Sequence, residues 1–135
     1  MTQTHDAFSG SWKANHEQSR FDPNHRPSQA SMRLEPTGYG YELRAEGIHE
    51  GKPCVDKTTI VLDGAEHPVD GAPGVSSFSF RSDPRTIRMQ GKRDGQVIGE
   101  ATYAVSEDGA RLTATVWGTD AQQRHFQTVV VFDRE

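Results

Sequence analysis

The sequence has one cysteine, no long apolar run and almost no helical pattern, and each absence narrows the possible structures. Cys54 has no second cysteine to pair with, so an internal disulfide is excluded. No apolar run approaches the roughly 18–20 residues that a membrane-spanning helix needs. Residues 1–6 contain neither a basic segment nor an apolar one, so we expect no signal peptide and a cytoplasmic protein. A sequence trimmed of its leader would begin in the same way.

The charge and apolar content exclude further classes of protein. The formal net charge is −4 and the isoelectric point is near 5.8, which argues against general nucleic-acid binding, since that requires a basic surface. Apolar residues make up only 33% of the 135 residues. This length fits one domain over residues 1–135, in which we expect residues 1–6 to be flexible.

What the sequence does contain is a regular series of turn signals. Asp-Gly pairs occur at residues 63–64, 70–71, 94–95 and 108–109, and further turn signals with Pro or Gly lie at residues 35–38, 50–53 and 83–84. Most spacings are roughly 8–14 residues, which is the length of a strand plus a turn. The turns therefore predict consecutive β-hairpins.

The segments between the turns alternate apolar and polar residues with period two, as strands of an antiparallel sheet do. The strand runs are Phe8–His16, Ser31–Glu35, Tyr39–Glu46, Val55–Leu62, Ser76–Phe80, Thr86–Gln90, Gln96–Ser106, Arg111–Trp117 and His125–Asp133. Only His16–Arg20 could form a helical turn, and Pro23 and Pro27 end it. We therefore predict an all-β fold with little or no helix, a single antiparallel up-and-down β-barrel of nine or ten strands. A two-sheet sandwich is the alternative, but it usually needs longer crossover connections.

The first strand resembles that of the calycin superfamily, which includes lipocalins and fatty-acid-binding proteins. The resemblance lies in Gly10-Ser11-Trp12, with Arg134 as the candidate to cover the Trp12 indole and Arg124 as the second choice. Residues 62–69, 105–109 and 131–134 also resemble small bacterial lipocalin-like proteins. The resemblance implies a calycin-like barrel that binds a small ligand. The Arg-x-Tyr motif that holds the carboxylate in fatty-acid-binding proteins is replaced here by Val129-Val130-Val131-Phe132.

Alternation assigns one apolar face of the strands to the barrel interior. We expect this inner face to carry Met32, Leu34, Tyr41, Leu43, Phe78, Phe80, Ile87, Met89, Ala101, Tyr103, Leu112, Ala114 and Phe126. The ligand-binding candidates among them are Tyr41, Leu43, Phe78, Phe80, Met89, Tyr103, Leu112 and Phe126. Tyr41, Tyr103 and Thr128 would supply polar groups inside. Trp117 falls on the outer face, at a rim or a contact surface.

Histidines and nucleophiles form no recognisable catalytic pattern. No two of the six histidines lie at i,i+2 or i,i+4 spacing, so we predict no metal site. No nucleophile elbow, P-loop or dinucleotide-binding motif is present, so we expect no catalytic residue and no cofactor.

We therefore predict non-catalytic binding of a small apolar or amphipathic ligand inside the barrel, by a protein that could form a homodimer. Two alternatives stay open. One is a haem-binding barrel or another barrel enzyme that uses a mouth histidine, His67 or His125. The other is an assembly module with a filled core, in which outer faces pair.

Overall fold

The computed structural model describes residues 7–20, 29–49, 52–69, 73–119 and 124–135, and these residues form strands and turns without a helix. The strands are β1 (Gly10–Arg20), β2 (Gln29–Pro36), β3 (Gly40–His49), β4 (Lys52–Val61), β5 (Glu66–Pro68), β6 (Val75–Asp83), β7 (Thr86–Arg93), β8 (Gln96–Val105), β9 (Arg111–Thr119) and β10 (His125–Arg134). The all-β prediction is confirmed, and the strand that alternation did not reveal is β5, which has only three residues. The expected flexibility of residues 1–6 concerns a segment outside the described residues.

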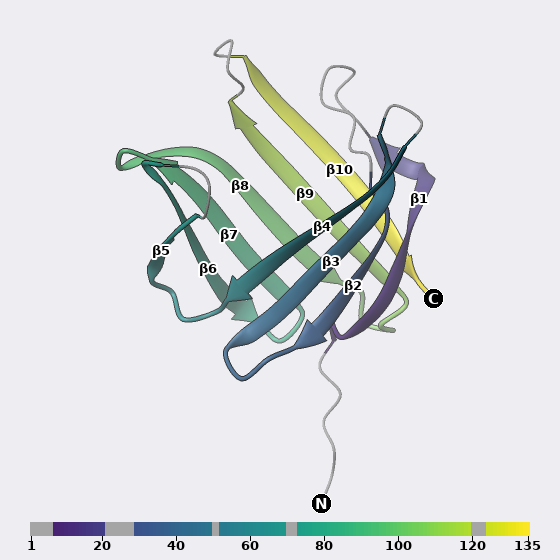
Figure 1. Ribbon diagram of the computed structural model, residues 1–135. Helices are drawn as coiled ribbons and strands as arrows, with labels where there is room; N and C mark the ends of the chain where they lie inside the picture. The colour runs from purple at the N-terminus through teal and green to yellow at the C-terminus, as the bar shows by residue number, and fades with distance from the viewer. Residues whose placement is uncertain (1–6, 21–28, 50–51, 70–72, 120–123) are drawn as a thin grey trace, which may run out of the picture.

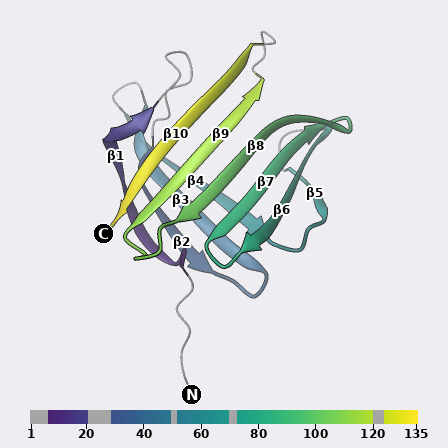
Figure 2. The same ribbon diagram turned by 180° about the vertical axis from the view of Figure 1, so that it is seen from behind.

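All ten strands belong to one antiparallel sheet in the order β4-β3-β2-β1-β10-β9-β8-β7-β6-β5. β1 pairs with β10, so the first and last strands lie side by side in the middle of the sheet. Figures 1 and 2 show that the sheet curls into a half-barrel. Its two edges are β4 and β5, which do not pair with each other in the described part of the chain. We call the boundary between β4 and the β5–β6 pair the seam.

β1 continues as a strand to Arg20, so the helical turn considered for His16–Arg20 is wrong. The β1–β10 register shifts between Asn15 and Arg20, and Ser19 takes over hydrogen bonds at this irregularity. Its hydroxyl donates to the Asn15 carbonyl oxygen at 2.7 Å and accepts the Val131 N–H at 2.9 Å. The side chain thus keeps the two strands attached where the backbone ladder is interrupted.

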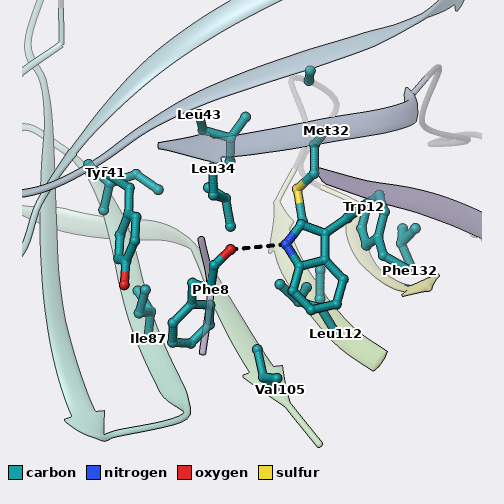
Figure 3. Packing of buried hydrophobic residues seen from close by; sticks show 14 of the residues in the cluster. Phe8, Trp12, Met32, Leu34, Tyr41, Leu43, Ile87, Val105, Leu112 and Phe132 are labelled. Atoms are coloured by element: carbon teal, nitrogen blue, oxygen red, sulfur yellow. Dashed lines mark hydrogen bonds between the residues drawn. The ribbon is translucent and has the colours of Figure 1, made fainter. Parts of the chain in front are cut away.

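The end of the half-barrel near Phe8 is filled by side chains, and we call it the closed end. Trp12 and Phe8 are each 0% exposed there, and the Trp12 indole N–H donates to the Phe8 carbonyl oxygen at 3.0 Å. Figure 3 shows these two residues among Met32, Leu112 and Phe132. Burial of such large apolar side chains stabilises a fold by roughly 1.5–3 kcal/mol each.

The predicted contact between Arg134 and Trp12 is confirmed. The Arg134 guanidinium carbon lies 4.2 Å from the centre of the indole ring. The same guanidinium donates hydrogen bonds to the carbonyl oxygens of Ala7, Ser9 and Gly109. Arg134 therefore ties the entering chain and the β8–β9 turn to the closed end.

Candidate functional site

The inner face of β7–β10 is built from rows of residues that are neighbours in the strand register. Near the closed end one row contains Val105, Leu112 and Phe132, which are at most 5% exposed. The next row contains Ile87, Tyr103, Ala114 and Val130. Together these rows form the packed part of the inner face.

Beyond the packed rows, the side chains of the inner face become small. Met89, Ala101, Val116 and Thr128 form a row that we call the Thr128 row. The following row, which we call the glycine row, consists of Gly91, Gly99 and Gly118 with Phe126 at its end. Most of these residues are partly exposed, whereas every residue of the packed rows except Tyr103 is buried. The inner face is therefore filled at one end and partly accessible toward the other.

A groove of about 430 Å³ runs along the seam, where the backbone leaves the half-barrel unclosed. It is lined by Lys57, Thr58, Thr59, Val61, His67, Pro68, Val69, Ser77 and Ser79. Ser79 pairs in register with Met89, and Ser77 pairs with Gly91, so both serines continue the inner-face rows. The groove thus borders β6 positions that are register neighbours of Met89 in the Thr128 row and Gly91 in the glycine row.

Thr128 and Tyr103 carry hydroxyl groups on the inner face. Thr128 is 5% exposed, and its Oγ1 has no hydrogen-bond partner within the described part of the chain. Burial raises the pKa of the Tyr103 hydroxyl above its ordinary value of 10.0. An unpaired buried hydroxyl costs about 1–3 kcal/mol, so Thr128 is a position where a bound molecule would gain a hydrogen bond.

At the closed end, Arg81 joins the two sides of the seam. It projects from the inner face of β6, and its Nη2 donates to the Tyr41 hydroxyl on β3 at 2.8 Å. The guanidinium carbon also lies 5.7 Å from the centre of the Phe8 ring and 5.6 Å from that of Tyr41. Arg81 therefore belongs to the closed end, beside the packed core.

The structure separates the predicted ligand-binding residues into three groups. Met89, Tyr103 and Phe126 lie on the inner face at or beyond the packed rows, whereas Tyr41, Leu43 and Leu112 are buried in the core. The third group is Phe78 and Phe80. For all three groups, a role in ligand binding stays a prediction.

Phe78 and Phe80 lie on the outer face, so their predicted inward orientation is wrong. Phe78 pairs with Gln90 and Phe80 with Arg88, and the two rings are 5.5 Å apart. The inner positions of β6 are Ser77, Ser79 and Arg81 instead. Because alternation has period two, choosing the more apolar set assigned every residue of this strand to the opposite face. The serines, Arg81, Gly91 and Gly118 were missed, since small or polar residues do not identify an inner face.

His67 and His125, the two histidines predicted at the barrel mouth, lie apart from each other. His67 Nε2 lies 2.8 Å from Asp63 Oδ2 at the groove, and His125 Nδ1 lies 3.2 Å from Thr119 Oγ1 on the outer side of β9–β10. The Ala65 N–H and the His67 side chain lower the pKa of the Asp63 carboxyl. Among the described residues, no three His, Cys, Asp or Glu side chains are grouped as a metal ion would require.

A search of the described residues for a helix with the length and apolarity of a membrane span found none. Neither a family model nor a curated protein matches the sequence. Among solved structures, the crystal structure of a secretary abundant heat soluble (SAHS) protein from Ramazzottius varieornatus, from a dimer sample, is similar to this chain. The TM-score is 0.64 at 11% identity, and the match covers 98% of each chain. At this identity the similarity concerns the fold alone, which is an all-β, antiparallel, calycin-like half-barrel.

Proposed function

We propose that this protein binds a small apolar or amphipathic molecule on the inner face of its half-barrel, without catalysing a reaction. The observation that carries the proposal is the 430 Å³ groove at the seam, because its residues Ser77 and Ser79 are register neighbours of inner-face rows whose side chains are mostly small and partly exposed. Its volume falls in the range of ordinary ligand sites, which is about 300–1,000 Å³. The guest would replace water over Met89, Ala101 and Val116, and burial of its apolar surface would drive binding.

The proposal is tested with Nile red, an uncharged dye whose emission strengthens and shifts to shorter wavelength in apolar surroundings. We expect saturable binding to the purified full chain. Ala101→Phe introduces a large side chain into the Thr128 row and should weaken binding at least tenfold. Absence of saturable binding would contradict the proposal.

Thr102→Phe is the matched control, because it adds the same ring one position along β8 on the outer face. We expect this variant to bind the dye as the unmodified chain does. Equal losses in the two variants would mean that the dye binds elsewhere, and the proposal would then fail. Far-ultraviolet circular dichroism of both variants checks that the sheet is retained.

We also propose that the chain forms a homodimer through the outer face of β6–β9. Trp117 is 41% exposed there and lies in one register row with Glu100, Gln90 and Phe78. Exposed aromatic side chains are enriched at protein interfaces. The similar solved protein came from a dimer sample, which supports the same proposal. Sedimentation equilibrium should give a dimer for the unmodified chain and a monomer for Trp117→Ser.

Kinship with small bacterial lipocalin-like proteins is part of our proposal as well. It is supported by the Gly10-Ser11-Trp12 motif and its Arg134 partner, which occupy the positions expected for a calycin. A solved structure of such a bacterial protein with the same seam between its fourth and fifth strands would support the assignment.

A further inference from the structure

Among the described residues, the Thr128 row and the glycine row carry a hydroxyl group but no charged side chain. The Thr128 row and the glycine row, extended by Ser79 and Ser77 on β6, hold only apolar, glycine and hydroxyl-bearing residues. On β4 the inner-face positions next to the groove are Thr58 and Asp56, and the latter is an exposed carboxylate. The other ionisable groups at inner-face positions beside these rows are Arg81 on β6 and His67 on β5, which pairs with Ser77.

The nearby cations are directed elsewhere. Arg81 is bound to the Tyr41 hydroxyl and stacked near two rings at the closed end, and Arg134 is engaged over Trp12. Lys57 lines the groove, but it alternates with Asp56 and Thr58 on β4 and pairs in register with Arg44 on the outer face. His67 is held by Asp63. None of these groups lies in the Thr128 row.

The buried Thr128 hydroxyl lacks a partner among the described residues, and it marks where the polar group of a guest would bind. An uncharged hydroxyl or carbonyl group would form a hydrogen bond with Oγ1 and remove the cost of leaving it unpaired. A carboxylate in the same place would lose its hydration without gaining a cation, and buried charges need such a partner.

We infer that the guest is an uncharged, mainly apolar molecule with a hydroxyl or carbonyl group, which bonds to Thr128 at the buried end of the site. This inference rests on the proposed inner-face binding. It excludes a fatty-acid anion bound with its carboxylate inside. The raised pKa of Tyr103 agrees with surroundings that do not stabilise an anion.

The test compares 1-dodecanol with dodecanoate, which have the same chain length, as competitors of Nile red at pH 8. We expect the alcohol to displace the dye at a concentration at least tenfold lower than the carboxylate does. Equal or stronger displacement by dodecanoate would overturn the inference and leave inner-face binding intact. If Nile red does not bind, the proposed function itself fails and the inference fails with it.

Thr128→Val tests the residue, because valine has the shape of threonine without its hydroxyl. We expect this variant to bind 1-dodecanol about fivefold more weakly, as loss of one ordinary hydrogen bond implies. Its affinity for dodecanoate should change little. Because the substitution removes an unpaired buried hydroxyl, the urea midpoint of the ligand-free protein should not fall. Unchanged affinity for 1-dodecanol would overturn the assignment of Thr128.

Thr115→Val is the matched control. Thr115 lies on β9 and faces outward, since it pairs with Thr102 and Val129 between the inner-face positions of that strand. We expect this variant to keep the affinity for 1-dodecanol. A loss equal to that of Thr128→Val would show a general effect of the sheet, and would overturn the inference.

Discussion

At the residue scale, the closed end depends on the close approach of Gly10 to Arg134. Gly10 has φ +126°, and a Cβ atom there would lie 2.8 Å from Arg134 Nη1. A side chain would therefore both strain the backbone and push the guanidinium away from the Trp12 indole. The Gly-x-Trp motif and the arginine on the last strand thus form one structural unit.

We expect Gly10→Ala to lower the free energy of unfolding by about 1–3 kcal/mol, the usual cost of a strained backbone conformation. Urea denaturation followed by tryptophan fluorescence measures this change. Gly38→Ala is the control, because no atom lies within 4 Å of the place that a Cβ would occupy there and its φ is not in the left-handed region. Equal stabilities for the two variants would contradict the role given to Gly10.

Asp108 stabilises the β8–β9 turn as a carboxylate. The Ser106 hydroxyl donates to it at 2.6 Å and the Ala110 N–H at 3.0 Å, and these bonds lower the pKa of Asp108 below 3.8. Because the pKa is lower in the folded state, this stabilisation is present above the unfolded pKa of about 3.9 and is lost as pH falls through the folded value.

Asp108→Asn keeps an acceptor oxygen without the charge. We expect its urea midpoint to lie below that of the unmodified chain above about pH 5, with the difference shrinking toward zero as the pH falls below the lowered pKa of Asp108. Urea titrations at a series of pH values measure the two curves. A difference that grows as the pH falls would have the wrong sign for this explanation.

At the scale of the strands, the turn residues predicted where the strands begin and end. Which side chains of a strand face the interior was harder to predict from the sequence. Asp94 with φ 50° and Gly95 with φ 86° form the tight β7–β8 turn that their residue types indicate. The faces of β8, β9 and β10 were also predicted correctly. On β6 the inner face carries serines and an arginine, because this strand borders the seam and the end of the packed core. Its neighbours in the sheet are β5 and β7, and Arg81 also contacts Tyr41 on β3, which lies far away in the sequence.

The Arg81–Tyr41 pair is the contact that crosses the seam at the closed end. We expect Arg81→Met and Tyr41→Phe each to destabilise the fold, and their combined effect to be less than additive. A coupling energy of about 1 kcal/mol is reasonable for one hydrogen bond with a ring contact. Urea denaturation of the four proteins of the double-mutant cycle measures it. Full additivity would mean that the pair does not hold the seam.

At the scale of the whole molecule, two strands that are consecutive in the sequence do not pair in the described part of the sheet, whereas the first and last strands do. β4 and β5 follow each other in sequence without pairing, while β1 pairs with β10. The sequence pattern could not predict this arrangement. A connection of hairpin length has the same kind of turn residues whether or not the two strands that it joins pair with each other. A closed cylinder is the natural expectation from edge protection. In the described part of the chain β4 and β5 do not pair, and the Arg81–Tyr41 contact joins the two sides of the seam at the closed end.

A circular permutant that begins at Ala65 and ends at Gly64, with residues 1–6 as the linker, should therefore keep the sheet. Arg134 Nη2 lies 2.7 Å from the Ala7 carbonyl oxygen, so the linker spans a short distance. Every hydrogen-bonded strand pair would then be a neighbour in sequence, and we expect severalfold faster folding in stopped-flow experiments. A permutant opened between Asp94 and Gly95 is the comparison, because it cuts a paired hairpin and should fold more slowly. The reverse order of rates would contradict this account.

The position of the chain ends also determines how the molecule can be attached to something else. Ala7 and Glu135 both lie at the closed end, where the Glu135 N–H donates to the Ser11 carbonyl oxygen. Attachment through either terminus, to a tag, a fused domain or a solid support, would therefore be at the closed end. The glycine row would lie at the opposite end of the inner face, away from the attachment. If the inner face binds a small molecule as proposed, immobilised protein should bind and release it as freely as protein in solution.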